Sequence, residues 1–475
     1  MTLTETEMNA LKEVLEVLSL PTNTASARAR YSGHEPALDS DLAIGLAART
    51  AVMAQAIATA DFWALQGGPE QEITLDRTTA LYALCSGLFQ SVHGHDATIA
   101  KGAKAALSNF YRTRDNRWFH PMGTYPGLRD GALALLDCAN TPEAIARAIR
   151  ARDGLELEDA FAAADLAGTM VRSRSEWTAH PQGQALAAAP LVTVEKVANS
   201  SPPKPAPIPG RPLSGIRVLD FAHVIAGPVL ARTLAETGAD CLRVGAPAHL
   251  DPDVFLLETG WGKRAAFLDF EREGDLDHMR RLVRESDIFV QSWRPGLMEE
   301  WGLTAEELAA HRGPDRSGLI HVSVDSWGRT GPWARRKGFE QLAQSATGVA
   351  HTQGKGGPPR YVPTALLADY LAAYLGAAGA VAALHRRAQE GGSYEVRVSL
   401  ARVTMWSQEL QTPGRTAGAP FPPNGPRPKF IERDSAYGRL RHFAPFAQYS
   451  HTVADWAHAP RPTGADPALW TKSAA

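Results

Sequence analysis

Residues 211–244 have the sequence RPLSGIRVLDFAHVIAGPVLARTLAETGADCLRV, and this stretch decides the fold class. The apolar residues 216–220 predict a short strand, which a loop with a Gly-Pro pair separates from a helix predicted over residues 229–237. A glycine stands where this helix is expected to end, and residues 240–244 predict a second strand. The stretch is therefore one β–α–β unit, for which we expect parallel strands and a right-handed connection.

Strand and helix patterns continue to alternate after this unit. The alternation predicts an α/β fold with a Rossmann-like, doubly wound parallel sheet. Such sheets bind ligands in the crevice at the carboxyl ends of their strands. Strands are predicted at residues 265–270, 288–291 and 319–324, and helices at residues 276–285 and after the capping box Thr304-x-x-Glu307.

Proline-rich segments divide the chain. Residues 200–212 (SSPPKPAPIPGRP) predict an extended linker, because repeated proline blocks both helices and central strands. Residues 1–199 have mainly helical patterns and are expected to form a smaller α+β domain. The Rossmann-like domain is predicted over residues 213–412, and a Pro-rich C-terminal tail over residues 413–475.

The composition favours a globular protein in a reducing compartment. Of 475 residues, 44% are hydrophobic and 21% are charged, and the formal net charge of -2 argues against a nucleic-acid-binding surface. Cys85, Cys138 and Cys241 form no CxxC pair, so we predict neither a disulfide framework nor a metal site. The N-terminus lacks a signal-peptide pattern, and we expect a cytoplasmic protein without a membrane segment.

Asp369 is the sharpest candidate for a functional residue. It is the only charge in the apolar residues 365–384, which we predict to be a buried helix that begins after Pro363 and Thr364. Asp369 would then lie past the first turn, where it cannot serve as the N-cap. A buried carboxylate must be paired, hydrogen-bonded or protonated, and the sequence leaves open whether its role is structural or functional.

Other groups that could contact a ligand lie at the predicted strand ends. The turn over residues 223–228 is not a GxGxxG motif, although small residues at a helix start still allow a phosphate or an adenosine to approach. A serine-hydrolase triad is not indicated, because there is no GxSxG elbow, and the histidines lack metal-ligand spacing. Cations that could bind phosphate are Lys263, Arg264, Arg294 and Lys337, although each could also be a solvated surface charge.

The order of these stretches resembles class III CoA-transferases, the CaiB/BaiF family. The resemblance covers about residues 212–400, and no single motif carries it. The motifs are RPLSGIRVLD (211–220), AGP (226–228), TGAD (237–240), GKR (262–264), RPG (294–296), SWGRTGP (326–332), Ala368-Asp369 at the head of a helix of small residues, and GGS (391–393).

This resemblance implies a Rossmann-like domain that binds CoA, a small domain and an interlocked homodimer. By position, Asp369 matches the family's catalytic aspartate, which takes the acyl group from CoA as a mixed anhydride, and Glu340 matches an active-site acid. Coenzyme A is then a substrate, and no further cofactor is expected. The resemblance places the CoA site at Val224, Ile225, Ala226, Lys263, Arg264, Ser292, Trp293, Arg294 and Lys337.

The sequence departs from the family pattern in its CoA contacts and in its domain order. Gly245 replaces a usual acidic residue, Ser292-Trp293 replaces a frequent Asn-Phe, and Ala246 and Glu300 stand where certain transferases have arginine. Residues 115–197 resemble the family's small domain, which commonly follows the catalytic helix but here precedes it. The chain is therefore either permuted or built from a partial duplicate.

Two other functions stay open from the sequence. A 2-methylacyl-CoA racemase has this fold but needs a histidine at about Phe339, and phenylalanine cannot move a proton, although His223 or His351 could substitute. A non-catalytic CoA-binding subunit would fit the altered contacts, but the retained Asp369 argues against it. Acyl-CoA and a carboxylic acid are thus the expected substrates.

Overall fold

The structure is a computed structural model of the whole chain. It describes residues 3–22, 28–99, 106–204, 208, 210–247, 250–312, 316–410, 421 and 427–471. Parts of the Pro-rich linker and most of the Pro-rich segment at residues 411–426 lie outside the described residues.

A seven-stranded sheet forms the centre of the molecule, with strand order β11-β10-β9-β12-β13-β14-β8. Among the described strands of this sheet, only the β14–β8 pair is antiparallel, and the sheet confirms the predicted Rossmann-like α/β fold. From β9 the chain adds strands first on one side, β10 and β11, and then on the other, beginning with β12. Ligands bind in such folds at this switch point between β9 and β12. The strands are β8 (Thr193–Ala198), β9 (Arg217–Phe221), β10 (Asp240–Gly245), β11 (Lys263–Phe267), β12 (Ile288–Gln291), β13 (Ile320–Asp325) and β14 (Ser393–Ser399).

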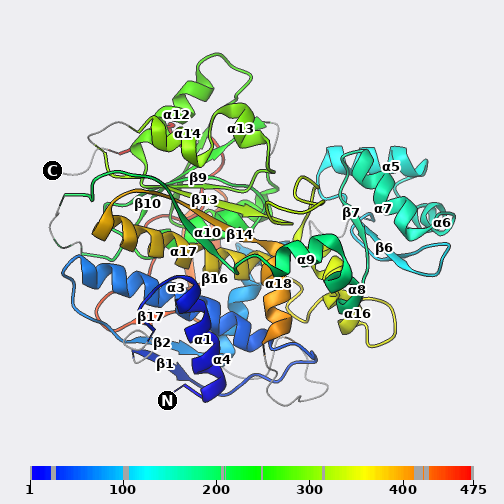
Figure 1. Ribbon diagram of the computed structural model, residues 1–475, viewed down its shortest axis with the longest axis horizontal. Coiled ribbons are helices and arrows are strands. Elements are labelled where there is room, and N and C mark those ends of the chain that lie inside the picture. The colour runs from blue at the N-terminus through cyan, green and yellow to red at the C-terminus, as the bar shows by residue number, and fades with distance from the viewer. Residues whose placement is uncertain are drawn as a thin grey trace.

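Helices cover both faces of this sheet (Figure 1). Successive residues of a strand point to opposite faces, so Val218 packs into one hydrophobic core and Leu219 into the other. One face carries α12 (Asp275–Glu285), α13 (Leu297–Trp301) and α14 (Ala305–Ala310), and the other carries α10 (Ala226–Ala235) and α17 (Ala368–Glu390). The remaining helices of this part are α11 (Asp253–Thr259), α15 (Glu340–Ala346), α16 (Val349–Gln353) and α18 (Leu400–Glu409).

Two predicted boundaries are wrong in ways that affect the site. Strand β11 begins at Lys263, so this lysine lies inside the sheet and not in the loop before it. Helix α17 begins only at Ala368, because Ala365 has a left-handed φ of 63° that a helix cannot include. Asp369 is therefore in the first turn, and Leu367 is the N-cap.

The residues before the linker form two separate units and also supply strand β8. The first unit packs its long helix α3 along α17, directly beneath the sheet (Figure 1). Its elements are α1 (Glu5–Val17), β1 (Ala29–Ser32), α3 (Ile44–Leu65), β2 (Ile73–Asp76), α4 (Arg77–Leu81), β3 (Ser91–Val92) and β4 (His95–Asp96). The second unit, which we call the lobe, is residues 106–172 and has its own core.

The lobe projects to one side of the molecule in Figure 1. It contains β5 (Tyr111–Arg112), β6 (Trp118–Pro121), α5 (Pro126–Leu136), α6 (Pro142–Arg150), α7 (Gly154–Ala163) and β7 (Gly168–Met170). Helices α8 (Arg174–Ala179) and α9 (Pro181–Ala187) then lead back to β8. The predicted division into domains stays a prediction.

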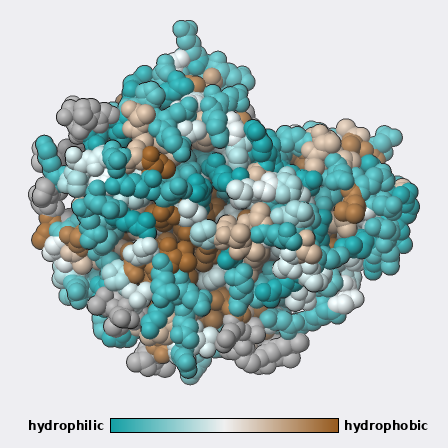
Figure 2. All heavy atoms as spheres, in the orientation of Figure 1, coloured by the Kyte–Doolittle hydropathy of each residue, from teal (hydrophilic) through white to brown (hydrophobic). Residues whose placement is uncertain are grey.

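The C-terminal tail folds back on the first unit. Its strands β15 (Phe430–Ser435) and β16 (Gly438–Phe443) form a hairpin, and β16 pairs with β3. Strand β17 (Gln448–Tyr449) pairs with β2. Figure 2 shows the molecule in the orientation of Figure 1. The face turned to the viewer is mainly hydrophilic, with apolar residues near its middle. No helix among the described residues is long and apolar enough to cross a membrane.

Candidate active site

Asp369 is the second residue of α17 and is 6% exposed. Its backbone position is set by the non-helical Leu367 and by the turn at Ala365. Within the described residues its carboxylate has no ion-pair partner. A nearly buried, unpaired carboxylate at a helix start is a candidate nucleophile.

Glu340 closes the N-terminal end of α17. Its carboxylate accepts hydrogen bonds from the backbone N–H groups of Leu367, Ala368 and Asp369, at 2.9, 2.7 and 3.2 Å. The side-chain amide of Gln344 donates a fourth, at 2.5 Å. A helix leaves such N–H groups unpaired at its start, so Glu340 holds the backbone that carries Asp369.

The two carboxyl groups influence each other's ionisation. Burial raises the pKa of Asp369 well above its ordinary value, and the adjacent Glu340 carboxylate raises it further. Burial also raises the pKa of Glu340, while its N–H donors offset part of that increase. The pair therefore retains a proton at pH values where two exposed carboxyl groups would both be ionised.

The lobe meets the segments around Glu340 through uncharged aromatic groups. Tyr125 stacks on Phe339, the residue directly before Glu340, with ring centroids 6.2 Å apart. His120 Nε2 lies 3.0 Å from the hydroxyl of Tyr361. Burial lowers the pKa of His120 to about 3, so this imidazole is neutral at physiological pH.

Three of the predicted CoA-binding residues, Val224, Ile225 and Ala226, lie where the turn after β9 leads into α10. Val224 has a φ of 65°, which is strained for a β-branched residue. Its N–H donates to Oδ1 of Asp251 at 3.0 Å, and this bond helps to hold the strained conformation. Ile225 and Ala226 follow at the start of α10.

Ser292 and Trp293 lie beside this turn, at the carboxyl end of β12. The hydroxyl of Ser292 accepts the N–H of His223 at 2.9 Å. Trp293 is buried, stacks on the His223 ring with centroids 4.6 Å apart, and donates to the carbonyl of Phe221 at 2.8 Å. The structure therefore brings the predicted residues of the two strand ends together.

Arg294 and Lys337 also come together, through the lobe. Asp165 accepts two hydrogen bonds from the Arg294 guanidinium, at 2.6 and 3.2 Å. The ammonium of Lys337 lies 2.7 Å from the Asp165 carbonyl and 3.1 Å from its carboxylate. Two cations that were predicted to bind phosphate thus share one carboxylate of the lobe.

Lys263 and Arg264 do not join this group. The ammonium of Lys263 is buried in the sheet, 2.6 Å from Asp220 and 2.6 Å from the carbonyl of Pro228. The guanidinium of Arg264 binds Asp240 at 2.9 Å. Because the ammonium of Lys263 is buried and already paired with Asp220, its predicted role as a phosphate-binding cation of the CoA site does not fit this arrangement.

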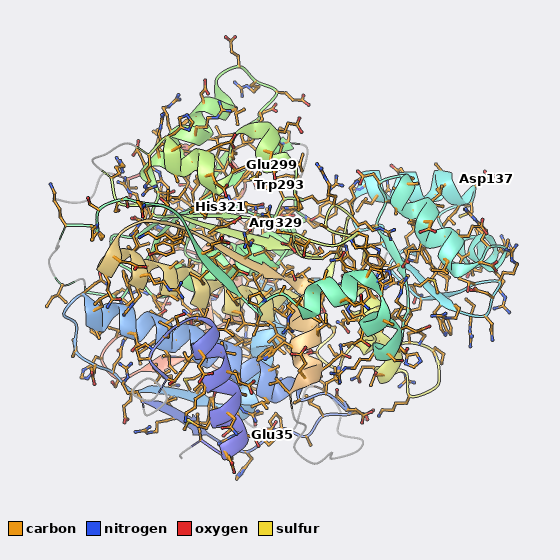
Figure 3. The ribbon with its side chains drawn as sticks, in the orientation of Figure 1. Glu35, Asp137, Trp293, Glu299, His321 and Arg329 are labelled. Carbon is orange, nitrogen blue, oxygen red and sulfur yellow. The ribbon has the colours of Figure 1, made fainter. Side chains whose placement is uncertain are left out.

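A hollow of about 610 Å³ lies next to Arg294, between the β12–α13 loop and the loop after β13. Glu299 of α13 and Arg329 of the loop after β13 both line it, and both are labelled in Figure 3. Its lining residues are Pro295, Gly296, Glu299, Arg329, Gly331, Pro332, Ala334 and Arg335.

The sequence did not indicate three residues that contact the predicted site. Tyr125 and Asp165 come from the lobe, and Asp251 lies in the segment after β10. None of them belongs to a motif, and each reaches its partner only through long-range folding. No local sequence signal would have found them.

Comparisons with known proteins agree on one family. Residues 213–435 match the model of CoA-transferase family III. An acetyl-coenzyme A transferase from Hypoxylon pulicicidum is 32% identical over 343 residues, which are 68% of this chain and 58% of that protein. The alpha subunit of succinyl-CoA–L-malate CoA-transferase from Chloroflexus aurantiacus is 35% identical over 224 residues, which are 43% of this chain and 51% of that subunit.

A third relative and a solved structure cover similar lengths. Acetyl-CoA:oxalate CoA-transferase from Acetobacter aceti is 27% identical over 44% of this chain and 58% of that enzyme. The crystal structure of Rv3272 from M. tuberculosis is 29% identical and covers 42% of this chain and 56% of that chain, with a TM-score of 0.38. The chain thus spans between half and three fifths of the relatives' own length. It carries a CoA-transferase family III domain at residues 213–435.

Proposed function

We propose that this protein is an acyl-CoA:carboxylate CoA-transferase in which Asp369 is the nucleophile. The observation that carries the proposal is the buried carboxylate of Asp369, whose pKa burial and Glu340 raise, at the start of a helix that Glu340 fixes. The family III domain and the three transferases among its relatives support the same reaction.

The ionised Asp369 attacks the thioester carbonyl of acyl-CoA. The carbon–sulfur bond breaks, CoA leaves as the thiolate, and an acyl-aspartyl anhydride remains. The thiolate then attacks the aspartyl carbonyl, which releases the donor acid and leaves an aspartyl-CoA thioester. The acceptor carboxylate then attacks the aspartyl-CoA thioester, which releases the thiolate and forms a second anhydride. The thiolate attacks the acceptor's carbonyl in this anhydride, so that acceptor acyl-CoA leaves and the Asp369 carboxylate is regenerated.

We place CoA in the crevice between the ends of β9 and β12. Val224, Ile225 and Ala226 on one side, and Ser292 with Trp293 on the other, are proposed to flank its pantetheine arm. Arg294 and Lys337 are proposed to bind its phosphates, since arginine and lysine suit such contacts. Their present partner is the partly exposed Asp165, which phosphate would have to displace.

The racemase alternative is less well supported. The ring of Phe339 stacks against Tyr125 where the racemase would need a proton-transferring histidine.

We further propose that the protein acts in the cytoplasm as a homodimer. Light scattering after size-exclusion chromatography tests the dimer, and a monomer at micromolar concentration would contradict it.

The decisive experiment is a screen of acyl-CoA esters against carboxylic acids, with wild type and Asp369→Ala. We expect transfer by the wild type and a loss of at least about a thousandfold in the variant, because the nucleophile is gone. Hydroxylamine should also modify Asp369 after acyl-CoA is added to the wild type. Equal transfer by both proteins would overturn the proposal, and exchange of the α-proton without an acceptor would favour a racemase.

Glu236→Gln provides a matched control. Glu236 is also a buried carboxyl group, and burial raises its pKa to about 8. It lies at the opposite end of α10 from the proposed CoA turn. Transfer by this variant should stay close to that of the wild type.

A further inference from the structure

Tyr125 is a residue of the lobe whose side chain packs outside the core of the lobe. It is the N-cap residue of α5, but its ring packs against the large hydrophobic core that includes the sheet. Its hydroxyl donates a hydrogen bond of 2.8 Å to Oδ1 of Asp251. Burial and this carboxylate raise the pKa of Tyr125, so the hydroxyl keeps its proton and stays a donor.

Asp251 connects Tyr125 to the proposed CoA turn. The same Oδ1 atom accepts the N–H of Val224 at 3.0 Å, and Oδ2 binds the guanidinium of Arg243 at 2.7 Å. The side chains of Asp251 and Arg243 are 1% and 6% exposed. Groups from the lobe, from the β9–α10 turn and from β10 therefore converge on one buried carboxylate.

Val224 requires such a support. Its φ of 65° is a conformation that a β-branched side chain disfavours, so the turn would relax if its N–H lost its acceptor or if that acceptor moved. Arg243 holds Oδ2 of Asp251, and the Tyr125 hydroxyl adds a second donor to Oδ1, so that this oxygen is held in place by more than the strained N–H of Val224 alone.

We propose that Tyr125 is a positioning residue of the acyl-CoA site: through Asp251 it holds Val224 in its strained conformation, so that docking of the lobe sets the shape of the CoA turn. This inference rests on the proposed function only for the identity of the ligand. The lobe would then contribute to CoA binding without touching CoA.

The test is a double-mutant cycle with Tyr125→Phe and Val224→Gly, with CoA binding measured by calorimetry. Tyr125→Phe keeps the ring and removes the hydroxyl, and we expect CoA to bind about tenfold more weakly, the effect of one lost hydrogen bond to a charged group. Glycine adopts a positive φ without strain. In the Val224→Gly background, Tyr125→Phe should therefore weaken binding less than about twofold.

Tyr111→Phe is the matched control, because the Tyr111 hydroxyl donates to the Ala106 carbonyl within the lobe. This variant should bind CoA as the wild type does. Unchanged affinity in Tyr125→Phe, or an equal loss in both Val224 backgrounds, would overturn the inference.

Hydrogen exchange separates this inference from the proposed function. Tyr125→Phe should speed exchange of the Val224 amide without any ligand, and an unchanged rate would contradict the positioning role. Failure of the wild type to bind CoA, with faster exchange in Tyr125→Phe, would instead contradict the proposed function.

Discussion

Asp369 lowers the stability of the fold that carries it. Its pKa is raised above the ordinary value of 3.8, so the native state holds a proton that the unfolded chain releases as the pH rises through and beyond 3.8. Stability is therefore lost over this range. We expect Asp369→Asn to be more stable than the wild type at pH 7 by more than about 1 kcal/mol, although inactive. Urea denaturation measures this difference.

The gain should shrink as the pH falls to 3.8 and below, where the unfolded chain also becomes protonated at Asp369. Asp159→Asn is a suitable control, because Asp159 is 77% exposed and its substitution should change stability little at any pH. A gain for Asp369→Asn that grew on acidification would contradict the explanation.

At the scale of the element, α17 depends on a carboxylate from another helix. Glu340→Gln replaces an acceptor of three backbone N–H groups by an amide that has its own donors, and we expect a destabilisation of about 1–3 kcal/mol. It also removes the negative charge beside Asp369, which lowers the pKa of that carboxyl group. The acidic limb of the pH profile of kcat/KM should therefore move to lower pH.

Glu307→Gln is a control that distinguishes the loss of a helix cap from the loss of the negative charge beside Asp369. Glu307 caps α14 together with Thr304, in a helix on the opposite face of the sheet from α17. Its substitution should reduce stability slightly and leave the pH profile unchanged. If Glu340→Gln lowered activity without shifting the profile, its role would be capping alone.

At the scale of the whole molecule, the buried carboxylate of Glu258 connects segments that are distant in the sequence. Glu258 binds Arg232 of α10 at 2.5 Å, His442 of the C-terminal hairpin at 2.7 Å, Ser86 at 2.5 Å and Tyr370 at 3.1 Å. Burial alone would raise the pKa of Glu258, but Arg232 and His442 outweigh it and lower that pKa to about 2. Tyr370 is the neighbour of Asp369, so this network also supports the site.

We expect Glu258→Gln to lower the free energy of unfolding by about 3–5 kcal/mol at pH 7, because it breaks a buried ion pair. The depressed pKa contributes stability above pH 4.5 that is lost as the pH falls toward 2, so the gap between variant and wild type should narrow at pH 3. Glu158→Gln, in the buried pair with Arg172 of the lobe, should cost stability without loosening the hairpin. Equal release of the hairpin in both variants, measured by hydrogen exchange, would contradict the assignment.

Local patterns in the sequence were sufficient for the α/β architecture. Strand β12 lies at the predicted residues 288–291, and the capping box of Thr304 and Glu307 is present, because both depend on neighbouring residues. A single charge in an apolar run was also enough to single out Asp369, since burial of an aspartate is costly wherever it occurs.

Only the tertiary structure decided which charges are available to a ligand and what surrounds Asp369. Lys263 and Asp220 are separated by 43 positions, and no short-range pattern shows that they meet inside the sheet. The contacts of Tyr125, Asp165 and Asp251 likewise depend on where the lobe docks. The sequence by itself therefore determined the layers and the candidate nucleophile through local periodicity and burial. The surroundings of that nucleophile follow from long-range packing, which periodicity does not encode.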